Sequence, residues 1–201
     1  MRLARFLIDP QMEPTTAPRP PVTAVMRRND QPRVIFLVGF MGAGKTTVGQ
    51  ALARRLDWRF EDLDDLIERQ QRRSIAEIFR DSGESEFRRA ESAALGELIA
   101  KLDQSPRIVA LGGGAFAQCE NAALLENAGA PVIFLDASPE ELFRRCSAEG
   151  RNRPLLGDRK QFRALYEHRR PFYLKAACHI DTDGKDQDTI AREVACSLGL
   201  G

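Results

Sequence analysis

The feature that most constrains the fold is a glycine-rich octapeptide, Gly39-Phe-Met-Gly-Ala-Gly44-Lys45-Thr46, which matches the pattern G-x-x-x-x-G-K-[ST]. It directly follows an apolar run over residues 34–38 and precedes an amphipathic stretch over residues 47–56. The motif therefore has the strand-loop-helix context of a phosphate loop. In that context the glycines let backbone N–H groups face inward, and the following helix contributes the positive end of its dipole. We expect the chain to bind a nucleoside triphosphate.

The polar residues of this loop have distinct expected roles. Lys45 is expected to reach the β- and γ-phosphates, and the Thr46 hydroxyl is placed to coordinate Mg²⁺. The same loop occurs in GTPase switches, ATPase motors and kinases, so it indicates a class of ligand and leaves the reaction open. The other residues expected to bind ATP here are Gly42, Ala43, Gly44 and Thr47.

The rest of the chain alternates short apolar runs with longer amphipathic stretches, which is typical of strand-helix units in a parallel sheet. Two helix starts are marked, because Ser74 and Glu77 form a candidate capping box and Pro139 follows Ser138 at a first helical position. The longest helix is expected over residues 84–102. The expected strands cover residues 34–38, 58–61, 108–111, 132–135 and 179–182. The fold class is α/β.

The first 31 residues differ in composition from the rest. Five prolines fall between residues 10 and 21 among polar side chains, and such a segment sustains neither helical nor strand periodicity. We expect a mostly disordered arm over residues 1–31 and one phosphate-loop domain over residues 32–201.

Composition excludes several functional classes. Thirty basic and 29 acidic side chains give a net charge of +1, so overall charge does not favour nucleic-acid binding. The sequence contains no apolar run of the roughly 18–20 residues that a bilayer span needs, and its four cysteines form no C-x-x-C pair. With only His168 and His179 as histidines, a metal-dependent hydrolase is not indicated. We expect a soluble cytoplasmic protein that contacts neither nucleic acid nor membrane.

A second group of polar residues lies where the second strand should end. Asp62 and Asp64 fall at the carboxyl edge of the predicted sheet, the edge at which α/β proteins bind ligands. Asp62 could hold Mg²⁺ through water, and Asp64 could accept a proton from an acceptor hydroxyl. The alternative is that these carboxylates only favour a helix N-terminus, which is the preferred interpretation for Asp65 and Glu68.

Further segments follow in a fixed order: 74–79, 83–91, 111–115, 153–156 and 169–173. Each is a weak signal alone. In this order, and with D-x-D after the phosphate loop, they resemble the shikimate kinase family over about residues 34–183, roughly three quarters of the chain.

The resemblance implies a nucleoside-monophosphate-kinase-like fold, in which three α/β/α layers surround a five-stranded parallel sheet. A substrate-binding region is implied over about residues 62–92, and a mobile lid over about residues 148–160. The implied reaction transfers the γ-phosphoryl group of ATP, with Mg²⁺ as cofactor, to the 3-hydroxyl of shikimate, a step in aromatic amino-acid biosynthesis. The family precedent also favours a monomer.

By the same resemblance, Lys45, Asp64 and Arg153 are catalytic, and Arg153 in the lid neutralises charge that develops during phosphoryl transfer. Arg88 and Arg169 bind the shikimate carboxylate, for which a planar guanidinium is well suited. For Arg88 the bland alternative is a surface arginine paired with a neighbouring glutamate.

The resemblance also implies which backbone amides face the substrate, which residues hold Mg²⁺ and which arginine stacks on adenine. The amides of Gly112, Gly113 and Gly114 lie near the substrate and the γ-phosphate. Thr46 and Asp62 hold the metal. Arg145 resembles the arginine that stacks on adenine, but its distance from the lid is one residue longer than expected, so Arg144 competes for that role.

Two other functions remain open at this stage. One is a gluconate-type sugar-acid kinase of the same superfamily, and the other is a non-catalytic homologue that binds nucleotide. A local departure also stands out, because Arg72 occupies a helix end where the family often has glycine; a left-handed arginine there costs about 1 kcal/mol.

Overall fold

The computed structural model describes residues 32–101, 105–148 and 159–200 of the chain. Its centre is a five-stranded sheet in the order β2-β3-β1-β4-β5, with every neighbouring pair parallel. The central strand β1 is buried along its whole length, as a parallel strand covered on both faces should be. The strands are β1 (Val34–Val38), β2 (Arg59–Asp62), β3 (Arg107–Ala110), β4 (Val132–Asp136) and β5 (Cys178–Asp181).

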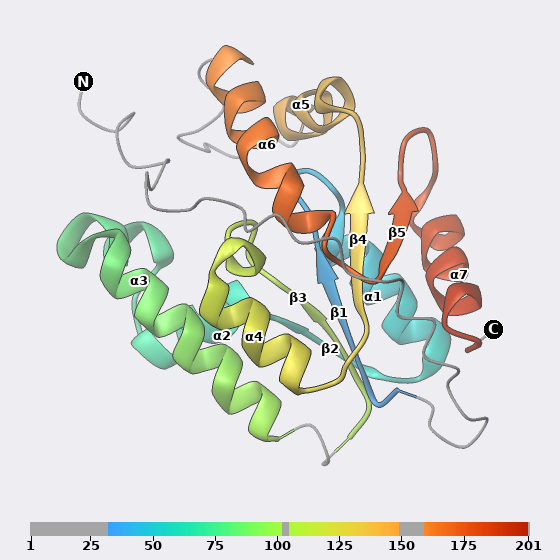
Figure 1. Ribbon diagram of the computed structural model, residues 1–201, viewed down its shortest axis with the longest axis horizontal. Helices are drawn as coiled ribbons and strands as arrows, with labels where there is room; N and C mark the ends of the chain where they lie inside the picture. The colour runs from blue at the N-terminus through green and yellow to red at the C-terminus, as the bar shows by residue number, and fades with distance from the viewer. Residues whose placement is uncertain (1–31, 102–104, 149–158, 201) are drawn as a thin grey trace.

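Helices cover both faces of this sheet and confirm the three-layer α/β/α architecture (Figure 1). Helices α1 and α7 pack together on one face, α3 and α4 lie on the other, and α5 and α6 stand beyond the carboxyl ends of the strands. The helices are α1 (Lys45–Leu56), α2 (Leu63–Gln71), α3 (Ile75–Ala100), α4 (Cys119–Asn127), α5 (Pro139–Ala148), α6 (Arg159–Tyr173) and α7 (Gln187–Ser197), with a short 3₁₀ turn η1 (Ala115–Ala117).

The strand order determines where a ligand can bind. The chain passes from β1 to the edge strand β2, returns to place β3 beside β1, and then crosses to β4 on the other side. The loops after β1 and β3 therefore leave adjacent strands at the carboxyl edge, and the crevice at such a change of direction is the usual ligand site of an open α/β sheet.

The predicted elements agree with the structure, apart from small shifts at their ends. Strand β1 has the predicted bounds, whereas β2 starts one residue later than predicted and β3 starts one residue earlier. The longest helix, α3, is interrupted by Gly83, whose φ of 81° and ψ of 176° are not helical. The predicted start at residue 84 therefore marks the second part of α3.

Two predicted helix ends are confirmed in detail. The Ser74 side chain accepts from the N–H of Glu77, while the Glu77 carboxylate accepts from the N–H of Ser74, so the capping box is complete. Arg72 ends α2 in the left-handed conformation, with φ 52° and ψ 31°. Arg72 thus takes the left-handed conformation whose cost, about 1 kcal/mol, the sequence raised as a possibility where the family often has glycine.

Candidate active site

The loop over residues 39–46 joins β1 to α1 in the way that its sequence predicts. Gly39, Gly42 and Gly44 all have positive φ, which lets the backbone turn tightly before the helix begins. A Cβ at Gly42 would lie 2.8 Å from the Cys146 sulfur of α5, so this position must be glycine. The ammonium group of Lys45 donates to the carbonyls of Gly39 and Phe40, at 2.9 and 3.1 Å, and so lies over the loop.

Thr46 and Asp62 meet across the sheet edge, although 16 positions separate them in the sequence. The Thr46 hydroxyl donates to Oδ2 of Asp62 at 2.9 Å. The other carboxylate oxygen of Asp62 accepts from the N–H of Asp64 and caps α2. Asp62 therefore caps a helix and also faces the phosphate loop, while its role in holding Mg²⁺ stays a prediction.

Asp64 faces the glycine turn that follows β3. A Cβ at Gly112 would lie 2.6 Å from Oδ1 of Asp64 and 3.0 Å from Oε1 of Glu91. Among the described residues, these two buried carboxylate oxygens have no protein hydrogen-bond partner. Buried polar atoms are normally paired, so the two oxygens are suited to accept hydrogen bonds from a bound molecule.

Burial raises the pKa of Asp64 to about 6, and the nearby carboxylates of Asp62 and Glu91 push it in the same direction. Lys45 and Arg88 oppose this shift. The result is a carboxyl group that ionises close to neutral pH, as a general base for a hydroxyl group should.

Arg88 approaches the same glycine turn from α3. Its guanidinium donates to Glu91 at 2.8 Å and to Glu84 at 3.1 Å, and only 18% of the side chain is exposed. A Cβ at Gly114 would lie 2.8 Å from its Nη2. The pairing with glutamates and the orientation toward the site are thus compatible, and the sequence had presented them as alternatives.

Arg169 reaches this place from another helix, α6. A Cβ at Gly113 would lie 3.7 Å from its Nη1. The glycine turn is therefore bordered by two carboxylates, Asp64 and Glu91, and by two guanidiniums, Arg88 and Arg169. Two cations and two acids around a backbone without side chains suit a small ligand that carries both a carboxylate and hydroxyl groups.

Glu91 is a site residue that the sequence does not single out. A glutamate so close to Arg88 on a helix is typical of a surface ion pair, yet Glu91 is fully buried. Burial raises the pKa of its carboxyl group despite the adjacent Arg88. Its position three residues after Arg88 on a helix was the signal available in the sequence.

A cavity of about 560 Å³ adjoins the phosphate loop between α5, α7 and the turn after β5. Arg145 lines it and is fixed by bonds to Glu141 at 2.7 Å and to the Thr182 carbonyl at 2.6 Å. Arg144 also lines it, but 69% of its side chain is exposed and its guanidinium pairs with Glu141 alone among the described residues. Arg145 therefore presents the more rigid planar surface to the cavity.

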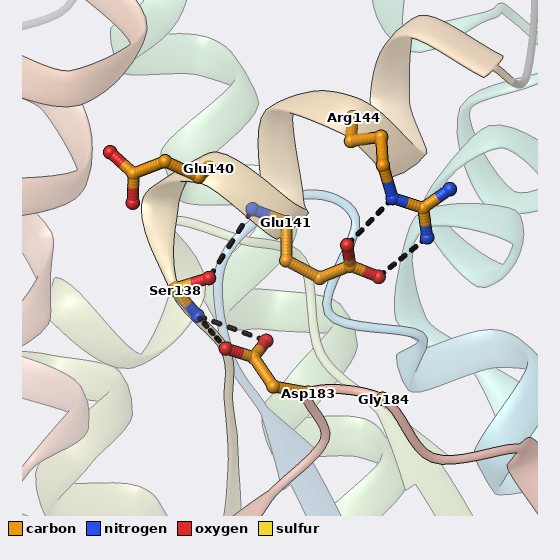
Figure 2. A pocket seen from close by; sticks show the side chains of 6 residues that line it. All are labelled: Ser138, Glu140, Glu141, Arg144, Asp183 and Gly184. Atoms are coloured by element: carbon orange, nitrogen blue, oxygen red, sulfur yellow. Dashed lines mark hydrogen bonds and ion pairs between the residues drawn. The ribbon is translucent and has the colours of Figure 1, made fainter.

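A neighbouring recess of about 310 Å³ continues along α5 (Figure 2). The Glu141 carboxylate faces the Arg144 guanidinium there, and Asp183 accepts from the backbone N–H of Ser138 at the helix start. These contacts tie the start of α5 to the turn after β5. Arg153 and residues 149–158 of the expected lid, like the arm over residues 1–31, lie outside the described residues.

A phosphate loop on a five-stranded parallel sheet, next to a polar site for a small acid, defines a P-loop kinase of small molecules. A family model described as "Shikimate kinase" matches residues 41–198. A shikimate kinase from Persephonella marina is 40% identical over 163 residues, which cover 81% of this chain and 96% of that protein. The chain belongs to the shikimate kinase family, whose members are ATP-dependent kinases.

Solved structures agree with this assignment. A shikimate kinase from Acinetobacter baumannii in complex with shikimate has a TM-score of 0.75 and 35% identity, over 84% of this chain and 93% of that one. A gluconokinase from Sinorhizobium meliloti has a TM-score of 0.58 at 22% identity, over 84% and 93%. The second likeness extends only to the fold, so the sugar-acid alternative receives no support beyond the shared architecture.

Proposed function

We propose that this protein transfers the γ-phosphoryl group of ATP to the 3-hydroxyl of shikimate. The observation that supports this most directly is the convergence of Asp64, Arg88 and Arg169 on the glycine turn after β3. Shikimate is a small cyclic acid with three hydroxyl groups. The two guanidiniums suit its carboxylate, and the two unpartnered oxygens of Asp64 and Glu91 suit its hydroxyls.

In this proposal Asp64 holds the acceptor hydroxyl and takes its proton as the oxygen attacks phosphorus. The amides of the turn from Gly112 to Gly114 face the substrate and the transferring group. Lys45 leaves the loop carbonyls that it contacts and stabilises charge on the γ-phosphoryl oxygens. Arg153 would act from the lid segment.

We propose Mg²⁺ as the cofactor and Thr46 and Asp62 as the residues that hold it. Their two oxygen atoms lie 2.9 Å apart, and hard oxygen donors are the ligands that Mg²⁺ prefers. Among the described residues, no cluster of three or more acidic, histidine or cysteine side chains could hold a metal. When bound beside Thr46 and Asp62, Mg²⁺ would supply positive charge next to the phosphates. Activity that persists undiminished in excess EDTA would contradict this assignment.

We place the nucleotide base in the cavity beside the phosphate loop, against the fixed guanidinium of Arg145. Gly42, Ala43, Gly44 and Thr47 belong to the same wall and would contact the phosphates. Arg144 is assigned to the rim, because its side chain extends into solvent.

The protein is further proposed to act as a cytoplasmic monomer. Leu174 is the only large hydrophobic side chain that is exposed among the described residues, so their surface offers no wide apolar face to a second copy. No described helix is long and apolar enough to span a membrane. Size-exclusion chromatography with light scattering tests the oligomeric state.

Replacing Arg88 by lysine is expected to raise the KM for shikimate by roughly 10- to 100-fold, because a lysine cannot bind a carboxylate bidentately and leaves Glu91 poorly paired. The KM for ATP should change little. Arg89→Lys is the matched control, since Arg89 is exposed and pairs with Glu86, away from the glycine turn. Equal effects of the two substitutions would remove Arg88 from the site.

The reaction itself is tested by following ADP release from purified protein with MgATP and either shikimate or gluconate. Turnover with shikimate and none with gluconate is the expected result. Phosphate must appear on the 3-hydroxyl, which nuclear magnetic resonance of the product identifies. Folded protein that fails to turn over millimolar shikimate would refute the proposal.

A further inference from the structure

One buried hydroxyl group connects the glycine turn to the helix that carries Arg169. Tyr173 is the last residue of α6, is fully buried, and donates its phenolic hydrogen to the carbonyl of Gly113. The guanidinium of Arg169 lies one helical turn earlier on α6, and its Nη1 would be 3.7 Å from a Cβ at Gly113. The Gly113 peptide therefore lies next to both the phenol and a cation of the site.

The surroundings of Tyr173 keep its hydroxyl in a single role. Its ring packs against Phe134 of β4 with centroids 5.3 Å apart, which fixes the direction of the C–O bond. Burial raises the pKa of the phenol to about 12, so it remains a hydrogen-bond donor throughout the working range of pH. A buried Tyr hydroxyl normally finds a hydrogen-bond partner, and here that partner is the Gly113 carbonyl.

The glycine turn needs such support because its own residues lack side chains. Residues 112–114 have no Cβ with which to pack, and close neighbours of Gly112 and Gly114 are the charged groups Asp64 and Arg88. Two backbone bonds, Ala115 N–H to Gly112 and Ala117 N–H to Gly114, stabilise the turn internally. Neither bond involves the Gly113 carbonyl. That carbonyl accepts its hydrogen bond from the Tyr173 hydroxyl.

We propose that Tyr173 is a positioning residue for substrate recognition, whose hydroxyl holds the Gly113 peptide in place beside the Arg169 guanidinium. The inference rests on the proposed function for its substrate, because Arg169 is there assigned to the shikimate carboxylate. Tyr173 itself does not contact the substrate. Its hydroxyl keeps the backbone amides of residues 112–114 where they and the Arg169 guanidinium can bind the same substrate molecule.

Tyr173→Phe removes only the hydroxyl and keeps the ring beside Phe134. The expected result is a KM for shikimate about tenfold higher, with the KM for ATP within twofold of wild type and a similar kcat at saturation. Loss of general packing would instead alter both KM values. Tyr166→Phe is the matched control, because Tyr166 lies on the same buried face of α6 but bonds Asp136, Ala137 and Arg170. It should leave the KM for shikimate within twofold.

A double-mutant cycle tests whether the effect acts through Arg169. In an Arg169→Ala background, Tyr173→Phe should change the KM for shikimate less than twofold, since the guanidinium beside which it holds the Gly113 peptide is gone. A full tenfold effect in that background would overturn the assignment. So would an unchanged KM for shikimate in Tyr173→Phe alone.

Hydrogen exchange without substrate separates this inference from the proposed function. The amides of Ala115 and Ala117 should exchange at least fivefold faster in Tyr173→Phe and at the wild-type rate in Tyr166→Phe. If the wild-type protein does not phosphorylate shikimate, the proposed function fails, and exchange alone decides whether Tyr173 holds the turn. Unchanged exchange would overturn the inference whatever the substrate.

Discussion

Replacing Asp64 by asparagine is expected to lower kcat by at least about 100-fold, within the range that a positioned general base contributes. The amide keeps the size of the side chain and still accepts a hydrogen bond from the acceptor hydroxyl, but it cannot take the proton. The KM for ATP should remain near its wild-type value. Asp65→Asn is the matched control, because Asp65 is the next residue of α2 and is exposed. Comparable losses in both variants would exclude a specific role for Asp64.

The raised pKa of Asp64 adds two expected results. In the wild type, kcat/KM should fall tenfold per pH unit below about pH 6, because protonation removes the base. Since the folded-state pKa lies above the usual 3.8, protonation of Asp64 stabilises the fold below that value, and this stabilisation is lost as the pH rises through about 6. At pH 8, Asp64→Asn should therefore increase the free energy of unfolding, by up to about 3 kcal/mol. Urea denaturation at pH 8 measures this, and a less stable variant would contradict it.

Replacing Lys45 by methionine is expected to lower kcat by about 100- to 1,000-fold, the usual cost of removing one group that stabilises transition-state charge. The methionine preserves the aliphatic stem, so the loop over residues 39–46 should keep its shape. Binding of ADP, measured by calorimetry, should weaken much less than kcat falls, since the backbone amides and the helix N-terminus remain.

The control for this substitution is Lys101→Met, at the exposed end of α3, which should behave as wild type. If Lys45→Met instead abolished ADP binding while single-turnover rates were preserved, Lys45 would be a binding group without a part in phosphoryl transfer.

The sequence predicted the class of fold because its signals were local. Strand β1 and the loop that follows are specified by consecutive residues, and the capping box at Ser74 needs only four. The ends of β2 and β3 shifted by one residue because the register between them sets those ends: Arg59 pairs with Arg107, and Trp58 lies before the ladder. Pairing across the sheet is not visible in either segment alone.

The site was partly predictable for the same reason. Lys45 and Asp64 belong to compact motifs, and Arg88 and Arg169 were identified by the order of several motifs. The contacts that support them come from tertiary packing. Burial of Glu91, and the hydrogen bond from Tyr173 to Gly113, depend on how α3 and α6 pack around the turn after β3, which no periodicity in the sequence reveals.

The close approach of charged groups to Gly112 and Gly114 has a consequence for inhibitor design. A methyl group at either position would lie within 2.9 Å of Asp64 or Arg88, so a substitution there must displace a residue on which the proposed activity depends. A compound whose affinity comes mainly from the backbone of this turn would thus leave few routes to resistance. Compounds that depend on the exposed Arg144 would select escape variants far more easily.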